Sequence, residues 1–134
     1  MPVTTAPSRE AIERVVGTYF NAISALDADA YIRCFAEGAI GHDPEGTPPH
    51  VGTAALRQFF TGIAGLCETC ALTPDAVHIG GSGAAVPWHL TVRGKNGKEA
   101  VAQGVDILTV NADGLVQELH AYWNPEPVIA ALTS

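Results

Sequence analysis

The chain has few cysteines and lacks a long apolar run. No stretch approaches the roughly 20 apolar residues of a membrane-spanning helix, so we expect no span. The cysteines, Cys34, Cys67 and Cys70, are an odd and sparse set, which argues against a disulfide framework. Residues 1–8 lack the basic and apolar regions of a signal peptide. These absences predict a cytoplasmic protein.

Basic residues are also scarce. Lys and Arg number 7 against 14 Asp and Glu, which gives a net charge of −7. Nucleic acids and anionic membrane surfaces are bound by clustered Lys and Arg. We therefore expect neither as a partner, and a neutral or cationic small molecule fits the charge better.

The chain does have enough apolar residues for a core. Its 134 residues, 47% of them apolar, are typical of one globular domain. No internal repeat or linker divides the sequence. We expect one domain over 1–134, with a flexible arm at 1–7. Two prolines follow Asn124, so we expect the tail at 125–134 to lie over the surface.

Three segments in the first half have helical spacing. Ser8 precedes an apolar stripe that predicts a helix over about 9–25 with Tyr19 on its buried face. Asp27 is expected to cap a second helix that ends at Gly38 and turns Tyr31 inward. A third helix is expected from a cap at Thr53 to about residue 65.

The second half has the pattern of strands. Asn-Gly and Asp-Gly turns separate alternating runs, and Pro74 marks a bent or edge strand. The expected strands are 39–42, 66–79, 84–92, 99–110 and 115–123. Helices followed by a meander of strands indicate an α+β fold. A curved sheet wrapped around a packed helix would leave a cavity at its open end.

Asp43 ends the short apolar run Ile40-Gly41-His42 and precedes a Pro/Gly-rich turn. Proline pushes the residue before it towards extended geometry, so Asp43 is expected to end a strand at the rim of a pocket, partly wet. The alternative is an ordinary Asp-Pro turn without chemistry.

Asp106 stands in the middle of the strand Gly104-Val105-Asp106-Ile107-Leu108. A lone carboxyl among apolar neighbours is costly unless it is paired, neutral or facing a site. We expect Ala102 and Gly104 to leave empty volume beside it, and desolvation to keep Asp106 protonated as a hydrogen-bond donor. The alternative is that this face is exposed to solvent.

Tyr19, Asp43 and Asp106 together suggest one kind of chemistry. A wetter aspartate can accept a proton, while a neutral aspartate and a tyrosine hydroxyl can both donate to one oxygen. That combination is suited to proton abstraction next to a carbonyl, with two donors holding the enolate oxygen.

On these residues the sequence resembles the ketosteroid isomerases, within the nuclear-transport-factor-like, SnoaL-like superfamily. The resemblance runs from about Val16 to Trp123. The matching segments are Tyr19 with its helix, Phe35-Ala36-Glu37-Gly38-Ala39, Asp43-Pro44-x-Gly46-x-x-Pro49, Gly52-Thr53-Ala54-Ala55-Leu56-Arg57-x-Phe59, Val105-Asp106 and Ala121-Tyr122-Trp123. The set Tyr19, Asp43 and Asp106 is the selective part, because most members of the superfamily lack it.

The resemblance implies a cone-shaped, curved mixed β-sheet packed on three N-terminal helices, and a homodimer. It implies that Asp43 is the general base and that Tyr19 and Asp106 form an oxyanion hole. It implies no metal or organic cofactor. The sequence departs from the family at Phe35 and Phe60, where tyrosines support the catalytic tyrosine in the best-known bacterial members.

Two further expectations concern the surroundings of the site. His42 precedes Asp43 where an acidic residue is common, and when protonated it would lower the pKa of that base. Apolar side chains should form the wall that holds the substrate. The residues expected there are Phe60, Val86, Trp88, Leu119 and Trp123. The alternative for the last four is plain core.

Two other patterns carry weaker signals. Cys67-Glu68-Thr69-Cys70 has no second pair and no redox context, so we expect neither a zinc nor a redox site. The five histidines have no metal-ligand spacing, so we expect no metal.

The sequence therefore leaves three hypotheses. The first is an isomerase that moves the double bond of a 3-oxo-Δ5-steroid into conjugation, acting on a small hydrophobic ketone. The second is a cyclase or dehydratase acting on a polyketide or another enolisable ring. The third is a non-catalytic small-molecule binding or dimer-scaffold module, in which the two carboxyls would not converge with Tyr19 on one cavity.

Overall fold

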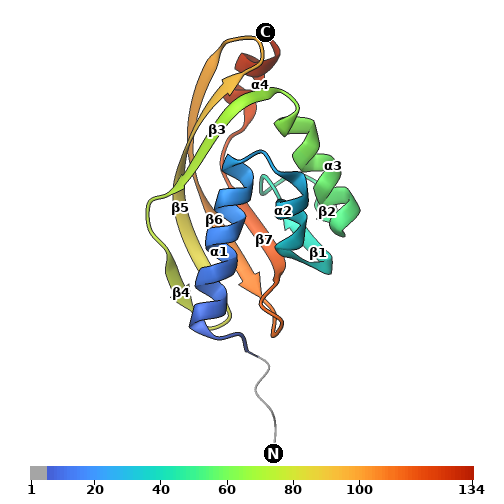
Figure 1. Ribbon diagram of the computed structural model, residues 1–134, viewed down its shortest axis with the longest axis vertical. Helices are drawn as coiled ribbons and strands as arrows, with labels where there is room; N and C mark the ends of the chain where they lie inside the picture. The colour runs from blue at the N-terminus through green and yellow to red at the C-terminus, as the bar shows by residue number, and fades with distance from the viewer. Residues whose placement is uncertain (1–5) are drawn as a thin grey trace, which may run out of the picture.

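The computed structural model describes residues 6–134. Over these residues, four helices and a seven-stranded mixed sheet make an α+β fold, as expected (Figure 1). Most of the arm expected at 1–7 lies outside the described residues. The helices are α1 (Arg9–Ser24), α2 (Ala28–Arg33), α3 (Thr53–Ala64) and α4 (Glu126–Thr133). The strands are β1 (Phe35–His42), β2 (His50–Val51), β3 (Cys67–Pro74), β4 (His78–Gly80), β5 (Gly83–Gly94), β6 (Glu99–Val110) and β7 (Val116–Tyr122).

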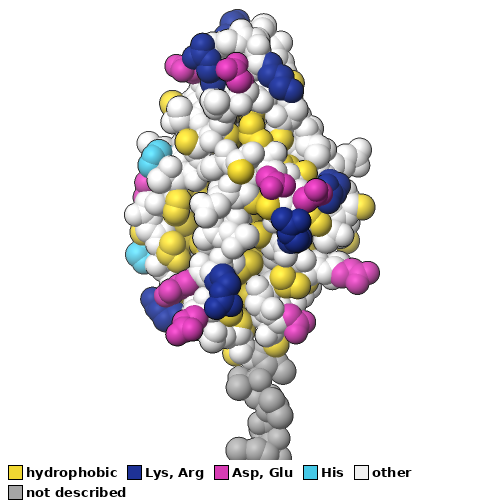
Figure 2. All heavy atoms as spheres, viewed as in Figure 1, with side chains coloured by type: hydrophobic (Ala, Val, Ile, Leu, Met, Phe, Trp, Pro, Cys, Tyr) yellow, Lys and Arg dark blue, Asp and Glu magenta, His cyan; other side chains and the backbone are white. Residues whose placement is uncertain are grey.

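The sheet has the order β2-β1-β7-β6-β5-β3, with β4 paired to β5. Strand β1 runs parallel to β7 and the other pairs are antiparallel, so the sheet is mixed. It curves without closing, and α1 to α3 lie on its inner side (Figure 1). On the face in Figure 2, basic side chains are interspersed with acidic ones.

Helix α1 forms where the sequence predicts it. The Ser8 hydroxyl accepts a hydrogen bond from the Ala11 amide at 3.1 Å, which satisfies an amide that the first turn leaves unpaired. Ile12, Val16 and Tyr19 follow at helical spacing, and each is at most 2% exposed. Their burial anchors the helix on the sheet and fixes Tyr19 in the interior.

Several elements differ from the expectations. Helix α2 ends at Arg33, and Gly38, with φ +78°, lies within β1 where the register with β7 shifts. The cap of α3 is Gly52, with φ +88°, and Thr53 is its first residue. The single bent strand expected over 66–79 is two strands, of which β3 is an edge strand. The pair His50–Val51 forms a short strand that the sequence did not suggest.

The prediction that residues 125–134 lie over the surface is wrong, and the difference affects the site. Residues 126–133 form α4, and its Val128 and Leu132 side chains are 2% and 4% exposed. Proline is tolerated in the first turn of a helix, so the two prolines start α4 rather than prevent it. Helix α4 packs against β5 and β6. Within residues 6–134, no helix has the length and apolarity needed to cross a membrane.

Candidate active site

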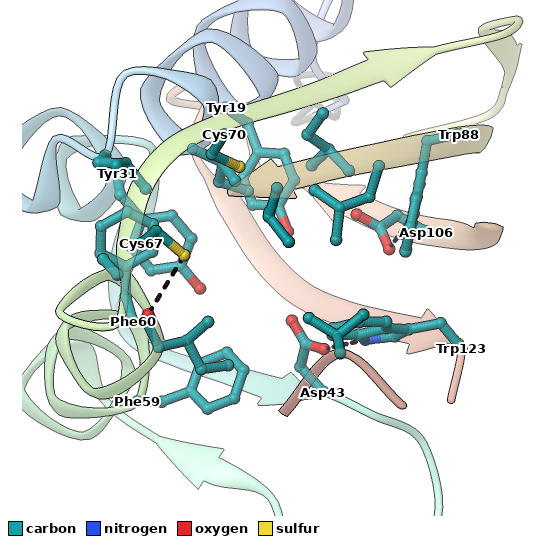
Figure 3. Close-up of a pocket in the computed structure, with 18 of the residues that line it drawn as sticks. Tyr19, Tyr31, Asp43, Phe59, Phe60, Cys67, Cys70, Trp88, Asp106 and Trp123 are labelled. Carbon is teal, nitrogen blue, oxygen red and sulfur yellow. Dashed lines mark hydrogen bonds between the residues drawn. The ribbon is translucent and has the colours of Figure 1, made fainter. Parts of the chain in front are cut away.

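Tyr19, Asp43 and Asp106 line one predominantly apolar cavity (Figure 3). Helix α1 supplies Tyr19, the turn after β1 supplies Asp43, and β6 supplies Asp106. The enclosed cavity has a volume of about 90 Å³, and the empty space in and around it, open solvent included, is about 720 Å³. Three parts of the chain far apart in sequence thus bring two carboxyls and a phenol to one space.

Asp106 is buried, with 2% exposure. The indole N–H of Trp88 on β5 donates to Asp106 Oδ1 at 2.9 Å. Burial raises the pKa of Asp106 to about 7, the charge of Asp43 adds to the rise, and hydrogen bonds from Trp88 and Tyr19 oppose it. The predicted burial is confirmed, and near neutral pH a large fraction of Asp106 is a neutral acid that can donate.

Asp43 follows the last residue of β1, as predicted, but it is not wet. It is 9% exposed, and the Trp123 indole N–H donates to its Oδ1 at 2.7 Å. Burial raises the pKa of Asp43 to about 6, and the Trp123 hydrogen bond opposes the rise. The turn is tied to β7 by the Glu45 amide, which donates to the Ala121 carbonyl at 2.8 Å. Of the two carboxyls, Asp43 is the stronger acid and hence the one ionised first as pH rises.

Tyr19 is 1% exposed and remains a phenol at neutral pH. Burial raises its pKa well above 10, and the nearby carboxyls of Asp106 and Asp43 raise it further. Tyr19 and Asp106 are close enough for each to shift the pKa of the other. Two donors therefore lie together on the side of the cavity formed by α1 and β6.

The space beside Gly104 is not empty, which corrects one expectation. A Cβ at this position would lie 2.5 Å from Trp88 Cζ2, 2.7 Å from the Tyr122 carbonyl oxygen and 2.8 Å from Trp123 Cβ. The Trp88 ring, the Tyr122 carbonyl and the Trp123 Cβ fill the volume that the missing side chain leaves. Gly104 therefore serves the site by admitting the Trp88 indole and the backbone that carries Trp123.

Part of the expected wall is correct. Trp88, Trp123 and Phe60 line the cavity. Val86 and Leu119 do not; each is 0% exposed within the main core. Both have the predicted inward orientation, but the cavity occupies only part of the concave face, and helix packing fills the rest. For these two residues the alternative of plain core is the right one.

Several cavity residues were missed as site residues, among them Tyr31, Val128 and Leu132. Tyr31 was predicted to face inward, but nothing in the sequence distinguished it from other core positions. Val128 and Leu132 of α4 close the cavity from the C-terminal end. An apolar run of helical spacing, Val128-Ile129-Ala130-Ala131-Leu132, was the available signal for them.

Phe35 and Phe60 pack around the phenol rings of Tyr19 and Tyr31. Phe60 stacks on Tyr31 with 4.5 Å between ring centroids and 16° between planes. Phe35 lies 6.1 Å from Tyr19 and 5.0 Å from Tyr31, centroid to centroid. They supply shape and no hydrogen bond.

His42 does not act on Asp43 as expected. Its ring stacks on His120 at 4.4 Å and 8°, because parallel pairing sets the two residues side by side on the other face of the sheet. His120 Nδ1 is 2.7 Å from Glu45, and its Nε2 is 2.9 Å from Glu118. The hydrogen bond with Glu45 is the main cause that raises the pKa of His120, which favours an imidazolium between two carboxylates.

His42, Glu118 and His120 also bring three potential metal ligands within 4.8 Å, a grouping that sequence spacing did not indicate. Both ring nitrogens of His120 are already engaged by carboxylates. We therefore describe these residues as an ionic cluster.

Cys67 and Cys70 line the cavity but have the character of neutral thiols. Burial raises the pKa of Cys67 and raises that of Cys70 to about 12. Redox nucleophiles and zinc ligands need thiolates. These properties agree with the expectation of no redox or zinc site.

With this geometry in view, the chain can be compared with known proteins. The SnoaL-like domain model matches residues 16–119, so the chain belongs to the SnoaL-like domain family. It is 25% identical over 118 residues to the Steroid Delta-isomerase of Nocardioides simplex, covering 88% of this chain and 94% of that protein. It is 30% identical over 128 residues to the Epoxide hydrolase LasB of Streptomyces lasalocidi, covering 92% of this chain but only 43% of that longer protein.

Solved structures support the fold. The epoxide hydrolase/cyclase-like enzyme SalBIII, described in pyran ring formation of the polyether salinomycin, superposes with a TM-score of 0.79 at 23% identity, over 87% of this chain and 93% of that one. A candidate polyketide cyclase from Xanthomonas campestris superposes with a TM-score of 0.79 at 21% identity. The match covers 92% of this chain and 98% of that one. These likenesses place the curved sheet and its helices in one fold group.

Proposed function

We propose that the protein is a cofactor-independent isomerase that moves a carbon–carbon double bond into conjugation with a ring ketone. The observation that carries the proposal is the pair of carboxyls with raised pKa values, Asp43 and Asp106, on one apolar cavity with the Tyr19 hydroxyl. A 3-oxo-Δ5-steroid is the substrate class, and the similarity to the steroid isomerase supports it.

The reaction follows from the different states of the three groups. Asp43, as carboxylate, removes a proton from the carbon between the carbonyl and the double bond. The electron pair moves to the carbonyl oxygen, and the dienolate accepts hydrogen bonds from Tyr19 and neutral Asp106. Asp43 then returns the proton at the far end of the dienolate. The product is the conjugated isomer, and no atom is gained or lost.

The test is the absorbance of the conjugated enone when purified protein is mixed with a 3-oxo-Δ5-steroid. Asp43→Asn removes the base and is expected to abolish turnover. Tyr19→Phe removes one donor to the oxyanion and is expected to lower kcat by about 10²-fold. Tyr122→Phe is the matched control, because Tyr122 is 51% exposed. Absence of enone from the wild-type protein would reject the steroid isomerase.

A second candidate is a SnoaL-like cyclase acting on another oxygenated ring. The 30% identity to the epoxide hydrolase LasB favours it, and so does the acid–base pair itself. Neutral Asp106 would protonate an epoxide oxygen as its C–O bond breaks, while Asp43 takes the proton of the attacking hydroxyl. Chromatography of products from a hydroxy-epoxide and from the steroid, assayed side by side, separates the two candidates.

A further inference from the structure

The hydroxyl of Tyr31 is buried without a partner. Tyr31 is 1% exposed, and within residues 6–134 its oxygen is the one buried side-chain N or O atom that has no hydrogen bond. Leaving such a group unpaired lowers the stability of the folded state. A buried hydroxyl without a partner therefore points to a functional role for this residue.

Packing prevents the hydroxyl from turning to solvent. The ring stacks on Phe60 at 4.5 Å and lies against Phe35 at 5.0 Å. Helix α2 fixes the backbone, since the Asp27 side chain caps it by accepting from the Ala30 amide at 3.1 Å. Tyr31 is therefore held with its polar end towards the cavity.

The hydroxyl is a separate feature from the two donors described above. Tyr31 lines the same cavity as Tyr19, with 5.8 Å between ring centroids. In Figure 3 its hydroxyl reaches the cavity on the side of Phe60 and Cys67, apart from the Tyr19 hydroxyl. The two phenols can therefore address different atoms of one ligand.

Its chemistry restricts what it can bind. Burial raises the pKa of Tyr31 well above 10, and the charges of Asp43 and Asp106 act in the same direction. The group is a neutral phenol that donates readily and does not become an anion. Phe60, whose ring stacks on that of Tyr31, offers no hydrogen-bond acceptor. The missing acceptor must arrive with the ligand.

We propose that Tyr31 is a substrate-binding residue that donates to a second oxygen atom of the substrate, distinct from the oxygen held by Tyr19 and Asp106. The substrate class is thus an apolar ring system with two oxygen functions. The inference rests on the proposed function only in taking Tyr19 and Asp106 as the site of the first oxygen.

The test uses two probes and two proteins. 2-Naphthol offers one oxygen, and dihydroxynaphthalenes with the second hydroxyl on the other ring offer two. The chain has two tryptophans, and both line the cavity, so intrinsic fluorescence reports binding there. Tyr31→Phe keeps the stacking ring and removes only the hydroxyl. Tyr122→Phe is the control.

We expect the wild-type protein to bind a dihydroxynaphthalene more tightly than 2-naphthol, and Tyr31→Phe to lose about tenfold in Kd for the former alone, the worth of one hydrogen bond. The Tm of the unliganded variant is expected to stay equal or rise. Equal losses for both probes, no wild-type preference, or a lower Tm of the variant would each overturn the inference. Steroid turnover is a separate assay, so its failure would reject the isomerase and leave this binding result standing.

Discussion

Trp88 and Trp123 meet edge to face, with 5.6 Å between ring centroids and 72° between planes. Each indole holds one carboxyl of the cavity, Trp88 that of Asp106 and Trp123 that of Asp43. The pair therefore couples the positions of the two acids. Gly104 lies against the Trp88 ring and the Trp123 Cβ, and there is no room for a Cβ at its position.

Gly104→Ala is expected to disturb both carboxyls at once. The new methyl would lie 2.5 Å from Trp88 and 2.7 Å from the Tyr122 carbonyl oxygen, so the ring or the strand must shift. Overpacking of this kind costs about 1–3 kcal/mol. Urea unfolding should show that loss, and the enone assay should show reduced kcat. Gly17→Ala is the control: Gly17 is exposed on α1 with nothing within 4 Å, and its alanine should be neutral or stabilising.

Activity should have a bell-shaped pH dependence. The base Asp43 must be ionised, so kcat/KM rises as pH passes its pKa of about 6. The donor Asp106 must be protonated, so kcat/KM falls as pH passes about 7. The enone assay across pH 4–9 measures both limbs. A rate that keeps rising above pH 8 would be inconsistent with a neutral Asp106.

Removing each indole N–H should move a different limb of that profile. Trp123→Phe deletes the hydrogen bond that lowers the pKa of Asp43, so the acidic limb should move to higher pH by up to about one unit. Trp88→Phe should likewise move the basic limb to higher pH, because the hydrogen bond from Trp88 lowers the pKa of Asp106. The two variants serve as controls for each other. Identical shifts in both would mean that the indoles do not act on separate carboxyls.

Asp106→Asn should make the protein more stable at high pH. The folded-state pKa of Asp106, about 7, lies above the unfolded value near 3.9, so folding takes up a proton between these pH values. Its contribution to stability is therefore full below about pH 4 and is lost as pH rises through 7. The amide cannot ionise and can still accept from Trp88.

Urea unfolding at two pH values measures this effect. At pH 8 we expect the free energy of unfolding of the variant to exceed that of the wild type by a few kcal/mol, on the order of the linkage energy. At pH 4 the two values should differ little. Asp113→Asn, at an exposed turn residue, is the control. A variant that gains nothing at pH 8 would contradict the raised pKa.

Shortening the side chain of Leu132 on α4 should open the cavity. Leu132 is 4% exposed and lines it, so Leu132→Ala is expected to cost about 2 kcal/mol or more and to weaken ligand binding. Ile129, on the same helix, is 40% exposed, and Ile129→Ala should change stability by less than about 0.5 kcal/mol. Denaturant unfolding and the fluorescence titration measure both effects. Equal behaviour of the two variants would mean that α4 does not close the cavity.

Several features of the fold were predictable because the signals were local. The Ser8 cap and the apolar stripe defined α1, and the Asn-Gly and Asp-Gly turns separated β5, β6 and β7. Gly38 misled, because a glycine with positive φ can bend a strand as well as end a helix. The C-terminal prolines misled for a similar reason, since the first turn of a helix accepts them.

By itself the sequence determined which residues share a face with Tyr19 and with Asp106, because periodicity along one helix and one strand decides which side a residue faces. It predicted that both faces turn inward, and the structure confirms this. The tertiary structure alone decided which inward residues meet the cavity. Val86 and Leu119 went to the core, while Tyr31, Val128 and Leu132 joined the site. The same holds for the link between Gly104 and the two tryptophans. These outcomes depend on contacts between segments far apart in the chain, which leave no local pattern to read.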